Sequence, residues 1–377
     1  MVSFIHTSDW QLGMTRHFLT DEAQARYSAA RLDAVNAIGA LANDKKCDFV
    51  LVCGDVFESN HVDRQIIVRT LEALNNYSMP VYLLPGNHDP LDASSVYHFH
   101  SFENSQPDHV NVIESSDAIE VVDGVQLIGA PWFSKQPLTD LVGQTYQGLV
   151  GEEGMIRILA GHGAVDTLSP DRDNPAVIQV GTVEEAIRAG VVDYLALGDR
   201  HSLTNIGDTE RIWYSGTPEP TDFDEVDPGK VLVVELDGSS CSVDPVQVGR
   251  WLFVERSFEV NGSEDLQLLE SWFDDQPTKD RTVVRLSLTG TVSIAQHAQL
   301  NAVLAQFEDL FAAIQRWGRR TDLAVVPEDH DFSDSSLSGF ASAAVDELRN
   351  LAINKGEKAE VAQDALALLY RLTGGER

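Results

Sequence analysis

The sequence is poor in cysteine and contains no long apolar run. Its three cysteines, Cys47, Cys53 and Cys241, show no CxxC spacing, which excludes a disulfide framework and a cysteine-rich zinc site. No stretch of about 18 apolar residues is present, which excludes a membrane-spanning helix. The chain begins with a strand-like segment, Val2 to Thr7, rather than a signal peptide. We therefore expect a cytoplasmic protein that does not contact a membrane.

Basic residues are also scarce. The chain has 27 Lys and Arg residues but 59 Asp and Glu residues, which gives a net charge of -32. A surface with this charge repels a polyanion as a whole. Contact with nucleic acid must then be local, assisted by bound metal, by a basic partner subunit, or by a small patch. Arg316, Arg319 and Arg320 form one candidate patch; a solvated helix end is an equally good interpretation of it.

Five short apolar runs are each followed at once by a polar cluster. Gly accompanies Asp, Asn or His in four of these clusters, and the first reads His-Thr-Ser-Asp. The runs are 2–5, 49–52, 81–84, 156–159 and 194–197. Helical periodicity lies between the first three, at 25–42 and 64–74. Alternating strands and helices predict an α/β layered core, and its polar clusters should gather in a crevice beyond the carboxyl ends of the strands.

At 377 residues the chain exceeds one ordinary core, so we expect several domains. We predict a main domain over 1–250, a small α+β domain over 251–326, an acidic, Ser-rich linker over 327–337, and amphipathic helices within 338–377. Two interpretations of the terminal helices stay open. Their apolar faces either fold back on their own domain or dock on a partner.

The polar clusters together supply a set of metal ligands. Two divalent cations about 3.5 to 4 Å apart can act on a phosphodiester, and they need one shared carboxylate with imidazole and oxygen ligands on each side. Residues two apart, such as Asp9 and Gln11 or Asp199 and His201, can face one site. The candidate ligands are Asp9, Gln11, Asp55, Asn87, His162, Asp199 and His201.

The order of these motifs resembles the five-motif signature of the calcineurin-like metallophosphoesterases. The motifs are Asp9-Trp-Gln, Gly54-Asp55, Gly86-Asn-His-Asp89, Gly161-His162 and Gly198-Asp-Arg-His201. More narrowly, His6 to Gly13, Gly54 to Phe57 and Tyr214 to Thr217 are similar to SbcD-type DNA repair exonucleases. The resemblance implies a layered β-sandwich flanked by helices, a smaller capping domain for DNA recognition, and C-terminal helices that dock on an SbcC-type coiled-coil ATPase. It also implies a homodimer and metal-dependent hydrolysis of DNA, as an exonuclease or endonuclease.

The resemblance also assigns roles to the site residues. It places Asp9, Gln11, Asp55 and His201 around one cation, and Asp55, Asn87, His162 and Asp199 around the other. It makes His88 the general acid or a cationic stabiliser of the leaving oxygen, with Asp89 holding the ring of His88.

Two ligands depart from the family pattern, because His is usual where Gln11 and Asp199 stand here. Both residues still offer oxygen, and Asp199 adds a third carboxylate beside Asp9 and Asp55. An oxygen-rich set favours manganese over zinc, with magnesium or iron(II) as alternatives. We therefore expect a slower or more manganese-dependent enzyme than the family norm.

Two other functions stay open. The chain could be a phosphodiesterase or phosphatase acting on a nucleotide or another small phosphoester. It could also be an attenuated or inactive scaffold subunit, with Gln11 and Asp199 marking the loss of activity.

Overall fold

The computed structural model describes residues 1–171, 173–326, 339–353 and 358–372. The chain forms two compact units, the first of residues 1–16 and 24–251, the second of residues 17–23 and 252–377. The main division therefore falls close to residue 250, where the sequence predicts a change of domain. The predicted linker at 327–337 lies outside the described residues.

The first unit is built on two mixed sheets. The first sheet has the order β12-β11-β1-β2-β3-β4, and β1 to β4 run parallel while β11 pairs antiparallel with both β1 and β12. Its strands are β1 (Val2–Thr7), β2 (Phe49–Cys53), β3 (Val81–Leu84), β4 (Val110–Val112), β11 (Lys230–Leu236) and β12 (Cys241–Gln247).

The second sheet has the order β5-β6-β7-β8-β10-β9, with β6, β7, β8 and β10 parallel and an antiparallel strand at each edge. Its strands are β5 (Ile119–Val122), β6 (Val125–Gly129), β7 (Ile156–His162), β8 (Tyr194–Gly198), β9 (Thr204–Ile206) and β10 (Ile212–Tyr214). The two sheets together place three of the five predicted strand ends in one sheet and two in the other.

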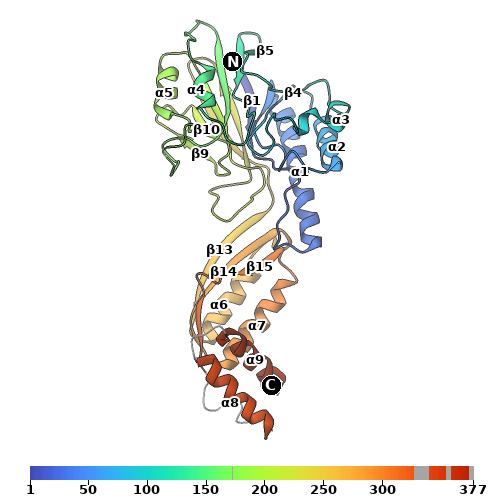
Figure 1. Ribbon diagram of the computed structural model, residues 1–377, viewed down its shortest axis with the longest axis vertical. Helices are drawn as coiled ribbons and strands as arrows, with labels where there is room; N and C mark the ends of the chain where they lie inside the picture. Colours follow the sequence, from blue (N-terminus) through green and yellow to red (C-terminus); the bar gives the residue numbers. More distant parts are fainter. Residues whose placement is uncertain (172, 327–338, 354–357, 373–377) are drawn as a thin grey trace. The chain divides into compact units, whose positions relative to one another are not determined.

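Alternate strand residues bury two different faces, as the pleat of a strand requires. Phe4 packs in the cluster between the two sheets, whereas Ile5 packs under α1 and α2. Figure 1 shows α1 to α3 on one side of the sheets and α4 and α5 on the other. The helices are α1 (Asp21–Lys45), α2 (Arg64–Leu74), the 3₁₀ turn η1 (Val96–His98), α3 (His100–Glu103), α4 (Leu141–Thr145) and α5 (Val180–Arg188). This helix, sheet, sheet, helix layering confirms the predicted α/β fold class.

The second unit alternates strands with helices. Its strands pair in parallel in the order β13-β14-β15, with β16 also on β14. The rings of Phe273 and Phe307 stack at 4.9 Å between α6 and α7 in its core. The elements are β13 (Leu252–Val260), α6 (Ser263–Asp274), η2 (Lys279–Arg281), β14 (Thr282–Val292), α7 (Ile294–Glu308), β15 (Ala313–Arg316) and β16 (Asp322–Val325).

Two terminal helices, α8 (Phe340–Ile353) and α9 (Ala359–Leu372), belong to the same unit. Val345 of α8 and Leu366 of α9 are buried in the core cluster that holds Phe307. These helices therefore fold back on their own unit, which is one of the two interpretations. Val361 and Leu368 of α9 nevertheless stay exposed, so the partner-docking interpretation also stays open. No helix within the described ranges is long and apolar enough to cross a bilayer.

Candidate metal centre

The loops that follow the strands are tied together by backbone hydrogen bonds. The amide of Asp9 donates to the carbonyl oxygen of Gly54 at 3.0 Å, and the amide of Gln11 donates to that of Asp55 at 2.9 Å. The amide of Asp199 donates to the carboxylate of Asp9 at 3.2 Å. Loops that lie far apart in the sequence thus meet at one point.

One half of the site is centred on His162, the last residue of β7. Its Nε2 lies 2.7 Å from Oδ1 of Asn87, 3.4 Å from Oδ1 of Asp55 and 3.8 Å from Oδ1 of Asp199. These four residues are those expected around one cation. Ligand atoms of Asp9, Asp55 and His162 all lie within 4.8 Å of one another, so Asp55 adjoins both halves of the site.

The other half is centred on His201. Its Nε2 lies 3.0 Å from Nε2 of Gln11 and 3.8 Å from Oδ1 of Asp9. The structure therefore brings together all seven residues that the sequence proposes as ligands. Their role in binding metal stays a prediction.

The backbone at four of these residues is strained. Asp9, Gln11, Asp55 and Asp199 have φ values of 52°, 44°, 55° and 92°, in the region that residues with a Cβ rarely adopt. Such strain persists only where surrounding structure enforces it, and it clusters at functional sites. Gly54 contributes to this packing, because a Cβ there would overlap the ring of His162.

Burial disfavours the charged forms of the carboxylates in this site when no cation is bound. It raises the pKa of Asp9 to about 6, even though His201 and His162 act to lower it. Burial acts in the same sense on Asp55, but the charge and hydrogen bond of His162 and the proximity of His88 outweigh it and lower the pKa of Asp55. A buried carboxylate needs a compensating positive group.

The donor set fits a pair of oxygen-preferring dications. It comprises three carboxylates, two side-chain amides and two imidazoles, and carboxylate and amide oxygens suit manganese and magnesium. In addition, Oε1 of Gln11 is buried without a hydrogen-bond partner, and an amide oxygen of that kind is a ready ligand. Asp9, Gln11 and His201 would hold one cation, and Asn87, His162 and Asp199 the other, with Asp55 between them.

His88 stands at the edge of the site with one ring nitrogen held. Its Nδ1 lies 2.8 Å from the carbonyl oxygen of Glu58, which can only accept, so Nδ1 carries the hydrogen. Its Nε2 lies 4.0 Å from Oδ2 of Asp55, and the side chain is 37% exposed. In this position His88 can contact a substrate that enters the site from solvent.

Asp89 does not hold the ring of His88, so that prediction is wrong. Its carboxylate instead accepts hydrogen bonds from the amide of Gly86 at 2.8 Å, the amide of Phe57 at 3.1 Å and the hydroxyl of Tyr97 at 2.6 Å. Burial and the nearby charge of Asp55 raise the pKa of Asp89 to about 6. Asp89 therefore fixes the two loops that carry Asp55 and Asn87.

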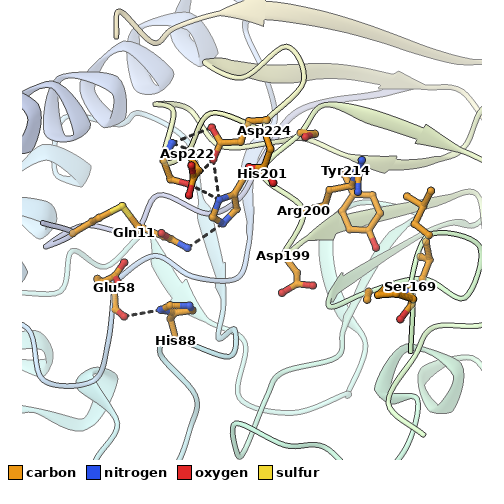
Figure 2. A pocket seen from close by; sticks show the side chains of 18 of the residues that line it. Gln11, Glu58, His88, Ser169, Asp199, Arg200, His201, Tyr214, Asp222 and Asp224 are labelled. Carbon is orange, nitrogen blue, oxygen red and sulfur yellow. Dashed lines mark hydrogen bonds and ion pairs between the residues drawn. The ribbon is translucent and has the colours of Figure 1, made fainter. Parts of the chain in front are cut away.

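A cleft of about 600 Å³ opens beside the predicted ligands. Figure 2 shows Gln11, His88, Asp199 and His201 facing it. Several lining residues were given no role from the sequence, among them Arg16, Arg200 and Glu225. Arg200 lies inside a recognised motif, but Arg16 and Glu225 follow no apolar run, and so no sequence signal marked them.

The chain is similar in sequence to known proteins. The model of the family described as calcineurin-like phosphoesterase matches residues 2–290. Among curated proteins, the chain is 25% identical over 278 residues to the SbcD component of nuclease SbcCD from Escherichia coli K12 and from Escherichia coli O157:H7, covering 65% of this chain and 68% of each relative.

Among solved structures, similarity is found to TT1561 of Thermus thermophilus, with a TM-score of 0.40 and 10% identity over 65% of this chain and 98% of that one. A dimetal phosphatase from Danio rerio gives a TM-score of 0.41 and 12% identity, covering 62% of this chain and 92% of that one.

Proposed function

Because the chain belongs to the calcineurin-like phosphoesterase family, we propose that it hydrolyses phosphodiester bonds of DNA with two divalent cations, foremost manganese. The observation that carries this proposal is the meeting of seven candidate ligands around Asp55. Distant similarity to a protein named as part of a nuclease supports a nucleic acid over a small phosphoester.

The residues would divide the work as follows. When bound, the cation pair would supply Lewis acidity toward the phosphoryl oxygens. His88, with Nδ1–H held by the carbonyl of Glu58, would present Nε2 to the leaving oxygen, either donating a proton to it or stabilising its charge. The strained loops keep Asp9, Gln11 and Asp55 in place before substrate arrives.

An assay of substrate classes tests the proposal against its rivals. Purified protein with manganese is offered single-stranded DNA, duplex DNA with ends, a nucleotide, and bis(p-nitrophenyl) phosphate. We expect cleavage of DNA that stops in EDTA. Hydrolysis of only the small esters would favour the phosphodiesterase alternative, and binding of manganese without any hydrolysis would favour the scaffold alternative.

Arg200 supports DNA as the substrate of this acidic chain. Its side chain lines the cleft, its Nε donates to Oγ1 of Thr204 at 3.0 Å, and it pairs with no carboxylate within the described residues. The two Nη groups therefore stay available for a phosphate, as the fork of a guanidinium favours.

We expect Arg200→Ala to raise the KM for DNA by roughly 10-fold to 100-fold, since a charge-assisted hydrogen bond contributes about 1.5–3 kcal/mol. The KM for bis(p-nitrophenyl) phosphate should change far less, because that ester carries no neighbouring phosphate. Arg69→Ala removes the same charge from an exposed position on α2 and serves as the control. Equal losses in both variants would assign the effect to net charge.

A partner subunit would supply the DNA affinity that a net charge of -32 denies to the chain. We take it to be an SbcC-type coiled-coil ATPase that docks on exposed apolar residues of α9. Val361 is 69% and Leu368 49% exposed, while Leu366 is buried. Deleting α9 would therefore disturb the core, and point variants are the sharper test.

We expect Val361→Asp with Leu368→Asp to abolish co-purification with the ATPase while leaving manganese-dependent hydrolysis by the isolated chain unchanged. Retained binding would exclude this face. The proposed homodimer is tested separately, by sedimentation of the chain alone.

A further inference from the structure

His201 is held at both of its ring nitrogens. Its Nε2 points toward Gln11 and Asp9, at 3.0 and 3.8 Å. Its Nδ1 lies 2.7 Å from Oγ1 of Thr221 and 3.1 Å from Oε1 of Glu225. Figure 2 shows the contacts on both sides of this ring.

Glu225 is fixed for this contact by the loop that carries it. Its side chain is only 4% exposed. It accepts hydrogen bonds from the amide of Thr221 at 2.9 and 3.1 Å, from the amide of Asp222 at 3.2 Å, and from the hydroxyl of Thr221. These donors around one carboxylate hold it in a single orientation toward the ring of His201.

This arrangement decides the tautomer of His201. The hydroxyl of Thr221 donates its hydrogen to Glu225, so toward the ring it can only accept, and a carboxylate also accepts. Nδ1 must therefore carry the hydrogen, which leaves the lone pair of a neutral ring on Nε2. That nitrogen faces the candidate ligands Asp9 and Gln11.

His162 in the other half of the site is held in the same manner. Its Nδ1 lies 2.8 Å from the carbonyl oxygen of Cys53, which accepts, and its Nε2 faces Asn87 and Asp55. Both imidazoles thus direct Nε2 toward the candidate ligands. A backbone carbonyl holds the ring of His162, whereas the side chain of Glu225 holds that of His201. Only the side chain can be removed by substitution.

We propose that Glu225 is a positioning residue for metal binding, which holds Nδ1–H of His201 and thereby directs the Nε2 lone pair to one of the two cations. The inference rests on the proposed metal-dependent function and assigns to Glu225 a part in it that acts through His201. Carboxylates behind ligating histidines fix ring orientation and raise ligand basicity, and their loss costs roughly 10-fold to 100-fold in metal affinity.

Titration calorimetry with manganese on the full chain tests this. Wild type should bind two ions, and in Glu225→Ala one of the two affinities should fall about 10-fold to 100-fold while the other stays unchanged. Glu225→Gln, which keeps the volume and one acceptor oxygen, should restore part of the loss. Asp224→Asn removes the same charge from an exposed neighbour that also lines the cleft and should leave both affinities unchanged.

A double-substitution cycle separates positioning from general charge or folding effects. If Glu225 acts through His201, then adding Glu225→Ala to His201→Ala should weaken manganese binding no further. Far-UV circular dichroism in EDTA checks that each variant is folded, and Glu225→Gln keeps the test decisive if the alanine variant is not.

The outcomes are distinguishable. A wild-type chain that binds no manganese overturns the proposed function. If the wild-type chain binds two manganese ions, three results would overturn the role of Glu225 alone. The first is an unchanged manganese affinity in both Glu225 variants, and the second is an equal loss of affinity in Asp224→Asn. The third is a further loss of affinity when Glu225→Ala is added to His201→Ala.

Discussion

Replacing Asp55 by Asn should lower manganese-dependent hydrolysis by more than about 100-fold, because even residues behind a ligand cost 10-fold to 100-fold in metal affinity or activity. Asp55 is buried, its Oδ1 lies 3.4 Å from Nε2 of His162, and the same oxygen accepts the backbone amide of His88 at 2.9 Å. The side-chain amide of Asn keeps one acceptor oxygen, but its NH₂ group would face either the ring of His162 or the backbone amide of His88. Kinetics and manganese titration on the same preparation measure both effects.

Asp63→Asn provides the matched control for Asp55→Asn. Asp63 is exposed and precedes α2 without a side-chain capping hydrogen bond, so its substitution should leave kcat and both manganese affinities unchanged. If Asp55→Asn retains wild-type rates and binds two ions, Asp55 is not the shared ligand.

Replacing His88 by Ala should lower kcat by about 10²-fold to 10⁴-fold, the range in which a positioned general acid contributes. Manganese affinity should not change, because His88 lies beyond the ligand set with Nε2 4.0 Å from Asp55. The loss should be largest for DNA, whose leaving alkoxide needs a proton, and smaller for bis(p-nitrophenyl) phosphate, whose leaving phenolate is stable without one.

The size of the effect on the two substrates separates the two roles considered for His88. An equal loss on both would favour charge stabilisation over proton donation. His61→Ala is the control, since His61 is exposed and does not line the cleft. A full-rate His88→Ala enzyme would remove this residue from the mechanism.

The sequence predicted the convergence of the site because parallel strands end at a common edge. Asp9, Asp55 and Asn87 follow three adjacent strands of one sheet, and His162 and Asp199 lie at the ends of two adjacent strands of the other. An apolar run followed by a polar cluster is a local pattern, so it can be read without the tertiary structure.

The residues that support the ligands could not be predicted in this way. Glu225 reaches His201 from a loop and does not directly follow an apolar run, and only the folded chain brings them together. Asp89 was misassigned because adjacency to His88 does not tell in which direction a side chain points; it turns toward Tyr97 and the loop amides instead.

The second unit was also predicted only in outline. The sequence predicted a small α+β domain over 251–326, but it did not predict α6 or the parallel pairing of β13 with β14. Parallel pairing depends on contacts distant in sequence, for example between Val254 and Val284, and no local pattern specifies such a register.

Crystals grown with manganese and measured at the manganese absorption edge test the metal centre most directly. We expect two anomalous peaks about 3.5–4 Å apart, one beside Asp9, Gln11 and His201 and the other beside Asn87, His162 and Asp199, with Asp55 contacting both. A single peak, or two peaks that do not share Asp55, would contradict a two-cation phosphoesterase.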